Sequence, residues 1–248
     1  MNTNPVWRES LEVFFGEGQG YAAYFYLLII LAPIEFFSLY LPSLDTQMWS
    51  GSASLFKVCA VTALLLIAYF TLRVANQEFA PWRFQPIKRW IGEQGQSAYS
   101  VAKGQLGFLT LHVAFSILLC SPLLIWAAAI ARTSPVSVLG TLVLLFFYAV
   151  SYGIWSLVTL VLWERRAESR QVFIRCFFFV LVVASALIYL PLNPVAFLLA
   201  YLGRQELSPL TLMGRTWSAT AVHFTFHLWL GGTGLAAYAY ALRRQVAV

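Results

Sequence analysis

Residues 136–163 read VSVLGTLVLLFFYAVSYGIWSLVTLVLW, a run of 28 residues without one charged side chain. The hydrocarbon core of a bilayer is about 30 Å thick and a helix rises about 1.5 Å per residue, so about 20 apolar residues cross it. Val136–Trp163 is long enough to span a membrane. It predicts a transmembrane helix, and with it an all-α membrane fold.

Other apolar stretches flank this one on both sides. They are Tyr21–Leu41, Ala53–Leu72, Leu106–Ala131, Val172–Leu190 and Trp217–Leu242. Pro194–Leu202 is also apolar but too short to span, which predicts a re-entrant or interfacial helix before the last span. We therefore expect residues 1–248 to form a single transmembrane domain with six spans.

The composition agrees with a membrane protein and excludes several other classes. Hydrophobic residues make up 60% of the chain and charged residues only 10%, whereas about 25% of residues are charged in ordinary soluble domains. The 16 basic and 10 acidic residues cannot cover the surface of a 248-residue soluble protein. A soluble enzyme, a nucleic-acid-binding module and a disordered chain are excluded, and the net charge of +6 acquires meaning only from its distribution across a membrane.

The lysines and arginines predict the orientation, because cytoplasmic segments carry an excess of both. With the N-terminus inside, twelve of the 16 fall on the cytoplasmic side: Arg8, Arg73, Arg83, Lys88, Arg89, Lys103, Arg165, Arg166, Arg170, Arg175, Arg243 and Arg244. Only Arg132, Arg204 and Arg215 fall outside, and Lys57 lies within a span. Both termini are expected in the cytoplasm of a bacterial-type cell, with the chain in its inner membrane.

Two segments outside the spans have amphipathic patterns. In Pro5–Gly16 the apolar side carries Trp7, Leu11, Phe14 and Phe15, which predicts a helix lying in the inner membrane interface. In residues 84–95, Pro86 can open a helix, and its apolar side carries Phe84, Ile87, Trp90 and Ile91. This second helix would either dock into a groove on another protein or lie flat on lipid, and the pattern supports both.

The sequence lacks the common catalytic and metal-binding motifs. It has no G-x-x-x-x-G-K-[ST] phosphate loop, no H-E-x-x-H, no G-x-S-x-G and no paired-cysteine zinc signature. Cys59, Cys120 and Cys176 are dispersed in or beside spans, as packing residues are. The chain is therefore expected to bind no cofactor and to be no enzyme by itself, so driven work would take its energy from a partner or an ion gradient.

Two charged residues lie inside the predicted spans. Glu35 is in the first span and Lys57 in the second, about 9 Å and 6 Å below the outer ends at about 1.5 Å per residue. Because a lone charge in the membrane is costly and consecutive spans usually pack together, the first hypothesis is a Glu35–Lys57 pair. The alternative is a functional role on a substrate or proton path.

The histidines are the remaining candidates for chemistry. His223 and His227 are one turn apart on one face of the last span, a spacing that suits a metal with a third ligand from elsewhere. The simpler interpretation is hydrogen bonding across a helix interface. His112 on the third span lies closer to the inner side and does not match the depth of His223 and His227, which counts against a haem held between these helices. A haem or metal redox subunit using His112, His223 and His227 remains an alternative. A scaffold subunit of a membrane complex is another.

Four features, taken in order, resemble the membrane subunit of type-2 ABC exporters, the permease family without a fused ATPase. The first is the amphipathic segment Pro5–Gly16, similar to the elbow helix of that family, and the second is Arg73–Gly104, at the position of its coupling helix and followed by the run Ala98–Gln105 into the third span. The third comprises Ser121-Pro122-Leu123-Leu124 and Glu164-Arg165-Arg166 around the third and fourth spans. The fourth is Leu190–Val195 with the short piece Pro194–Leu202, like the family's outer re-entrant element. One departure is that Pro86 lies far upstream of Lys103.

The resemblance implies an ATP-driven exporter that works by alternating access. Two copies of a cytoplasmic ABC ATPase would hold ATP and Mg²⁺, and a second permease subunit, identical or similar, would complete the membrane part. The resemblance places the ATPase contact at Lys88, Arg89, Trp90, Glu93 and Gln94, helped by the Arg165–Arg170 loop. The aromatic content suits a lipid-like or amphipathic substrate.

Overall fold

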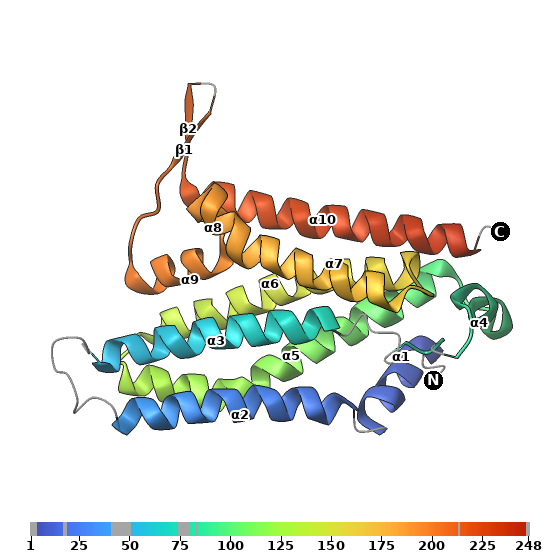
Figure 1. The fold of residues 1–248 in the computed structure, drawn as a ribbon, viewed down its shortest axis with the longest axis horizontal. Coiled ribbons are helices and arrows are strands. Elements are labelled where there is room, and N and C mark those ends of the chain that lie inside the picture. The colour runs from blue at the N-terminus through green and yellow to red at the C-terminus, as the bar shows by residue number, and fades with distance from the viewer. Residues whose placement is uncertain are drawn as a thin grey trace.

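A computed structural model of the chain describes residues 4–16, 19–40, 51–73, 80–82, 84–212 and 214–246. Most of these residues are helical, and the long helices lie side by side in one bundle (Figure 1). Apolar runs of this length become helices because lipid offers no partner to backbone N–H and C=O groups. The long helices are α2 (Gln19–Tyr40), α3 (Gly51–Arg73), α5 (Ala98–Ile130), α6 (Pro135–Leu162), α7 (Ala167–Phe179) and α10 (Ala219–Val246).

Four stretches of the described helices are long and apolar enough to cross a membrane. They are Ser54–Arg73, Ala98–Ile130, Pro135–Leu162 and Ala167–Ile188. The last combines α7, a π-helical turn at Val180–Ala184 and the short α8 (Ser185–Ile188). Helices α2 and α10, at the other two predicted spans, have 22 and 28 residues and run alongside these four (Figure 1).

Short helices occupy the segments between and before the long ones. They are α1 (Pro5–Leu11) with a π-helical turn at Glu12–Gly16, α4 (Ile87–Gln94), a 3₁₀ turn at Leu190–Leu192, and α9 (Pro194–Gly203). Asn4 caps α1 by accepting a hydrogen bond from the amide of Val6 at 3.0 Å, as helix-starting side chains do. Ser97 caps α5 in the same way, so this helix begins at Ala98, before the predicted start at Leu106.

The prediction of an all-α fold misses a small hairpin. Strands β1 (Leu210–Leu212) and β2 (Arg215–Trp217) pair antiparallel, with Leu212 opposite Arg215, and the hairpin projects beyond the bundle (Figure 1). Gly214 has a φ of +76°, the conformation that short hairpin loops require and glycine adopts without strain. Trp217, predicted to begin the last span, lies in β2, and α10 begins at Ala219.

Helix α6 lies at the centre of the packing, against α3, α5 and α10. Its buried residues point in several directions around the helix, and Tyr148 and Tyr152 are among the largest fully buried side chains. At Gly153, a Cβ would come within 2.6 Å of Leu109 Cδ1 on α5 and 2.7 Å of Thr71 Cγ2 on α3. Glycine therefore allows three helices to meet there.

Replacing Gly153 with alanine should destabilise the bundle, because Leu109 and Thr71 must both move. Overpacking of this kind costs about 1–3 kcal/mol. Thermal unfolding of the purified protein should show a lower midpoint for Gly153→Ala. Gly232→Ala on α10 is the matched control, since its Cβ would meet nothing within 4 Å. Equal midpoints for the two variants would contradict this packing.

Candidate functional site

Helix α4 lies at the end of the bundle that also holds both ends of the described chain (Figure 1). Its apolar side, formed by Ile87, Trp90 and Ile91, is buried against the chain itself. The ring of Trp90 lies 5.7 Å from that of Trp82. Burial raises the pKa of Glu9 on α1, and the side chain of Trp90 partly offsets this rise. The sequence left two possibilities for this face, a groove on a partner or the lipid surface. In the structure it packs inside the chain instead.

The N-terminus of α4 is attached to the connection between α6 and α7. The amide of Ile87 donates a hydrogen bond of 2.5 Å to Oε1 of Glu164. This connection is held in turn by Nη1 of Arg170, which donates to the carbonyls of Trp163 at 2.6 Å and Glu164 at 2.5 Å. Burial raises the pKa of Glu164, although the Ile87 amide and nearby Arg165 act in the opposite direction.

The outward side of α4 is polar. Lys88, Arg89, Glu93 and Gln94 are exposed, and Arg89 pairs with Glu93 at 2.7 Å. Hydrogen bonds from Arg89 and then Gln85 lower the pKa of Glu93. An exposed pair of this kind adds little stability, which leaves these side chains available for contact with a partner.

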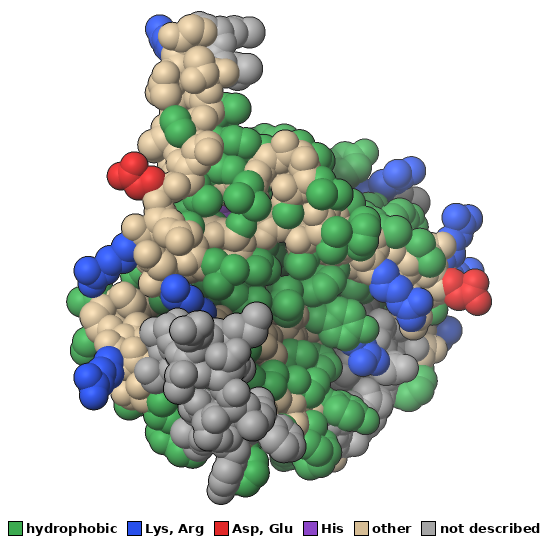
Figure 2. All heavy atoms as spheres, turned by 60° about the vertical axis from the view of Figure 1, so that its left-hand side comes forward, with side chains coloured by type: hydrophobic (Ala, Val, Ile, Leu, Met, Phe, Trp, Pro, Cys, Tyr) green, Lys and Arg blue, Asp and Glu red, His purple; other side chains and the backbone are tan. Residues whose placement is uncertain are grey.

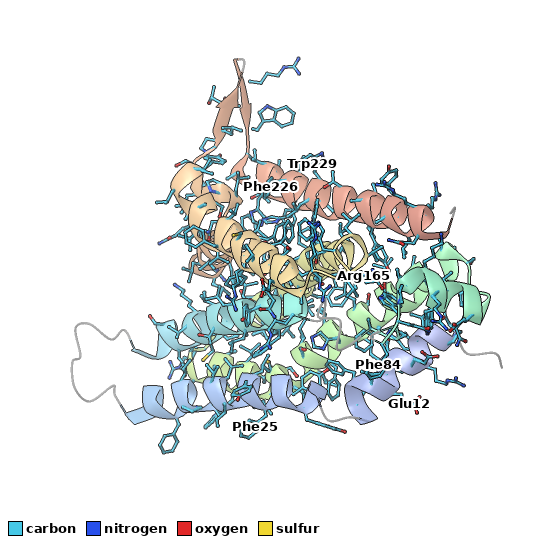
Figure 3. All side chains as sticks on the ribbon, turned by 45° about the vertical axis from the view of Figure 1, so that its right-hand side comes forward. Glu12, Phe25, Phe84, Arg165, Phe226 and Trp229 are labelled. Atoms are coloured by element: carbon cyan, nitrogen blue, oxygen red, sulfur yellow. The ribbon has the colours of Figure 1, made fainter. Side chains whose placement is uncertain are left out.

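The predicted ATPase-contact residues thus divide into two groups. The first group faces outward and consists of Lys88, Arg89, Glu93 and Gln94. The second is Trp90 alone, which is only 2% exposed and packs on the inner side of the helix. Phe84, predicted on the apolar side, instead precedes the helix and is 87% exposed. The second predicted contact segment includes Arg165 and Arg166, which are exposed just after the end of α6. Figure 3 labels Arg165 and Phe84.

His223 and His227 form a buried polar network between α10, α6 and the 3₁₀ turn. His223 joins Tyr148 Oη at 2.5 Å through Nε2 and the Pro191 carbonyl at 2.6 Å through Nδ1. His227 joins Tyr152 Oη at 3.4 Å and the Leu192 carbonyl at 3.2 Å. Both ring nitrogens of each histidine are thus engaged, as the helix-interface interpretation requires.

The sequence did not point to Tyr148 and Tyr152, which complete this network, nor to Asn193, which follows Leu192 in the chain. Tyr148 and Tyr152 are one turn apart on α6, the same spacing as the two histidines on α10, and this matched spacing was the available signal. Asn193 is 2% exposed and donates to the Val182 carbonyl, in the π-helical turn, at 2.6 Å. It also accepts from the amide of Ala196 at 2.9 Å. One side chain therefore joins the α7 segment to the start of α9.

His112 belongs to a separate cluster. Its Nδ1 lies 3.1 Å from Tyr24 Oη, and Phe14, Phe108 and Phe115 complete the surrounding aromatic group. The three histidines do not converge, and the described residues contain no group of three His, Cys, Asp or Glu side chains placed to hold a metal ion. Cys59 and Cys120 are buried, and Cys176 is exposed.

The structure describes only the Lys57 side chain of the predicted Glu35–Lys57 pair. Glu35 lies in α2 but its side chain is outside the described residues. Lys57 on α3 lies near α9: its Nζ is 3.6 Å from where a Cβ on Gly203 would be. Since a helix C-terminus carries partial negative charge, the end of α9 stabilises this ammonium group.

Comparison with known proteins adds no relative to this description. No protein-family model, no curated protein and no solved structure matches the chain.

Replacing Tyr148 with phenylalanine should destabilise the protein, because His223 Nε2 would lose its partner in a buried site. An unsatisfied buried polar group costs about 1–3 kcal/mol. The thermal midpoint of Tyr148→Phe should fall, whereas Tyr240→Phe on α10, where the side chain is 67% exposed, should leave it unchanged. A Tyr148→Phe protein as stable as the parent would show that this hydrogen bond contributes nothing.

Proposed function

We propose that this chain is the membrane subunit of an ATP-driven exporter of the type-2 ABC kind, with its ATPase on a separate chain. The observation that carries the proposal is the attachment of α4. The amide of Ile87 at its start donates a hydrogen bond to Glu164 in the α6–α7 connection, the helix packs on α10, and Trp90 lowers the pKa of Glu9 on α1 against the effect of burial. A partner that displaced α4 would therefore pull on the α6–α7 connection and on α10.

The distribution of charge supports a cytoplasmic position for this end. The described basic residues that lie there, or on helices that end there, are Arg8, Arg73, Lys88, Arg89, Lys103, Arg165, Arg166, Arg170, Arg175, Arg243 and Arg244. The opposite end has Arg132, Arg204, Arg215 and, on α3, Lys57. By the positive-inside rule this end faces the cytoplasm. The proposed topology is then six spans in the inner membrane of a bacterial-type cell, with both termini in the cytoplasm.

The proposed cycle is a two-state switch biased by the partner. Two ABC ATPase subunits bind ATP and Mg²⁺ and dock on the outward side of α4, next to Arg165 and Arg166. Their closure moves α4, and the hydrogen bond to Glu164 and the packing of α4 on α10 pass this movement to the ends of α6, α7 and α10. A second permease subunit, identical or similar, faces this one across the substrate path.

Other features favour this proposal over a redox subunit. The nitrogens of His223 and His227 are engaged with tyrosines and carbonyls, and His112 lies in another cluster. A haem or metal held by these three residues would require the bundle to rearrange. The scaffold alternative differs from the exporter in one measurable respect, because a scaffold has no effect on ATP hydrolysis by a bound partner.

Reversing the charge of the outward side of α4 should prevent ATPase binding. We expect Lys88→Glu with Arg89→Glu to reduce the amount of ATPase that co-purifies about tenfold, equivalent to about 1.4 kcal/mol. Both side chains are exposed, so the fold should be retained. The readout is the Mg²⁺-dependent ATPase activity of the complex purified from its native membrane.

Arg215→Glu on the hairpin is the matched control, since it reverses an exposed charge at the opposite end. It should leave ATPase binding intact. If the α4 double variant still assembled with an ATPase and stimulated it normally, the contact would lie elsewhere. A parent complex without ATPase activity would contradict the exporter itself.

A further inference from the structure

A large cavity lies at the opposite end of the bundle from α4. It has a volume of about 930 Å³ and lies between α6, α9, the connection that follows α9 and the start of α10. Its volume is within the range of small-molecule sites, about 300–1,000 Å³. Figure 2 turns this end toward the viewer and shows hydrophobic side chains over much of the face below the hairpin.

One wall of the cavity is apolar and aromatic. Val143, Leu144 and Phe147 come from α6, Phe197 from α9 and Phe224 from α10. The ring of Phe224 lies 5.8 Å from that of Phe147 and 5.5 Å from that of Phe197. Phe197 also stacks on His223 at 3.8 Å, so the histidine network holds this wall in place. A surface of this kind suits a hydrocarbon chain.

The mouth of the cavity is polar and charged. Arg204, Gln205, Glu206, Ser218 and Thr220 all line it. Arg204 and Glu206 are exposed, and no ion pair joins either to another described residue. Lys57 Nζ lies close to Gly203, directly before Arg204, which adds a second positive charge nearby. The cavity thus combines an apolar interior with a rim that carries a guanidinium group and a carboxylate, neither of them in an ion pair with another residue that the structure describes.

We propose that this cavity binds one phospholipid-like amphipath. The hydrocarbon chain lies against the phenylalanines, the phosphate of the headgroup pairs with the Arg204 guanidinium, and Glu206 accepts hydrogen bonds from a headgroup ammonium or hydroxyl. Arginine suits a phosphate because its planar fork can donate two parallel hydrogen bonds. That this molecule is the exporter's cargo rests on the proposed function, whereas binding itself does not.

The test is binding of palmitoyl lysophosphatidylethanolamine to the purified full-length chain in detergent, measured by native mass spectrometry. The parent should bind one molecule. Val143→Trp fills part of the cavity and should weaken binding at least tenfold. Leu139→Trp is its control, one turn earlier on α6, 64% exposed and outside the cavity lining. Equal binding by the two tryptophan variants would overturn the proposal, because the lipid would then be on the general surface.

The headgroup contact has its own matched pair. Arg204 and Arg132 both have a left-handed backbone, with φ of +51° and +50°, and both are exposed at this end, but only Arg204 lines the cavity. Arg204→Gln should weaken binding of the lysophospholipid about tenfold and leave binding of monopalmitoylglycerol, which lacks the phosphate, unchanged. Arg132→Gln should affect neither probe. Equal effects of the two arginine variants would overturn the headgroup assignment, and this comparison decides the matter if Val143→Trp fails to fold.

Failure of this site and failure of the exporter proposal give different results. The Lys88→Glu, Arg89→Glu protein should bind the lysophospholipid as the parent does, because α4 lies at the opposite end. Loss of ATPase coupling with lipid binding intact would therefore address only the partner contact. Intact ATPase coupling in the parent with no stoichiometric lipid binding would overturn only the cavity assignment.

Discussion

Close packing around α6 holds the bundle together. Helices α3, α5 and α10 all rest on it, and the contact at Gly153 leaves no room for a Cβ. Membrane helices associate without a hydrophobic driving force between them, so close approach and interhelical hydrogen bonds must hold them together. Here Tyr148 and Tyr152 supply those hydrogen bonds to α10, in register with His223 and His227.

The two ends of the bundle are organised differently around this centre. At one end α4 is fixed by its hydrogen bond to Glu164 and by the burial of its apolar side, and it presents charge outward. At the other end the histidines bind the 3₁₀ turn before α9, and Phe197 on α9 stacks on His223 beside the cavity. Phe197 thus lines the cavity and also contacts His223 in the core of the bundle. A movement of α10 against α6 would therefore alter the cavity.

The sequence predicted the long helices well, because an apolar run of that length has few alternatives in lipid. It predicted the amphipathic helix near Trp90 but not what covers its apolar face, since periodicity identifies a face without identifying its neighbour. The hairpin around Gly214 was missed because three-residue strands carry too little pattern. The cavity could not be predicted, since Val143, Phe197 and Phe224 come together only once the helix register is known.

The end of the bundle that faces the cytoplasm can be identified directly by labelling. Single cysteines at Lys88→Cys and Ser208→Cys, in a chain with exposed Cys176 replaced by serine, can be probed in intact cells with a membrane-impermeant maleimide. We expect labelling at position 208 from outside and at position 88 only after the membrane is permeabilised. Labelling of position 88 in intact cells would contradict the exporter proposal, because neither an ATPase nor its ATP could then reach α4.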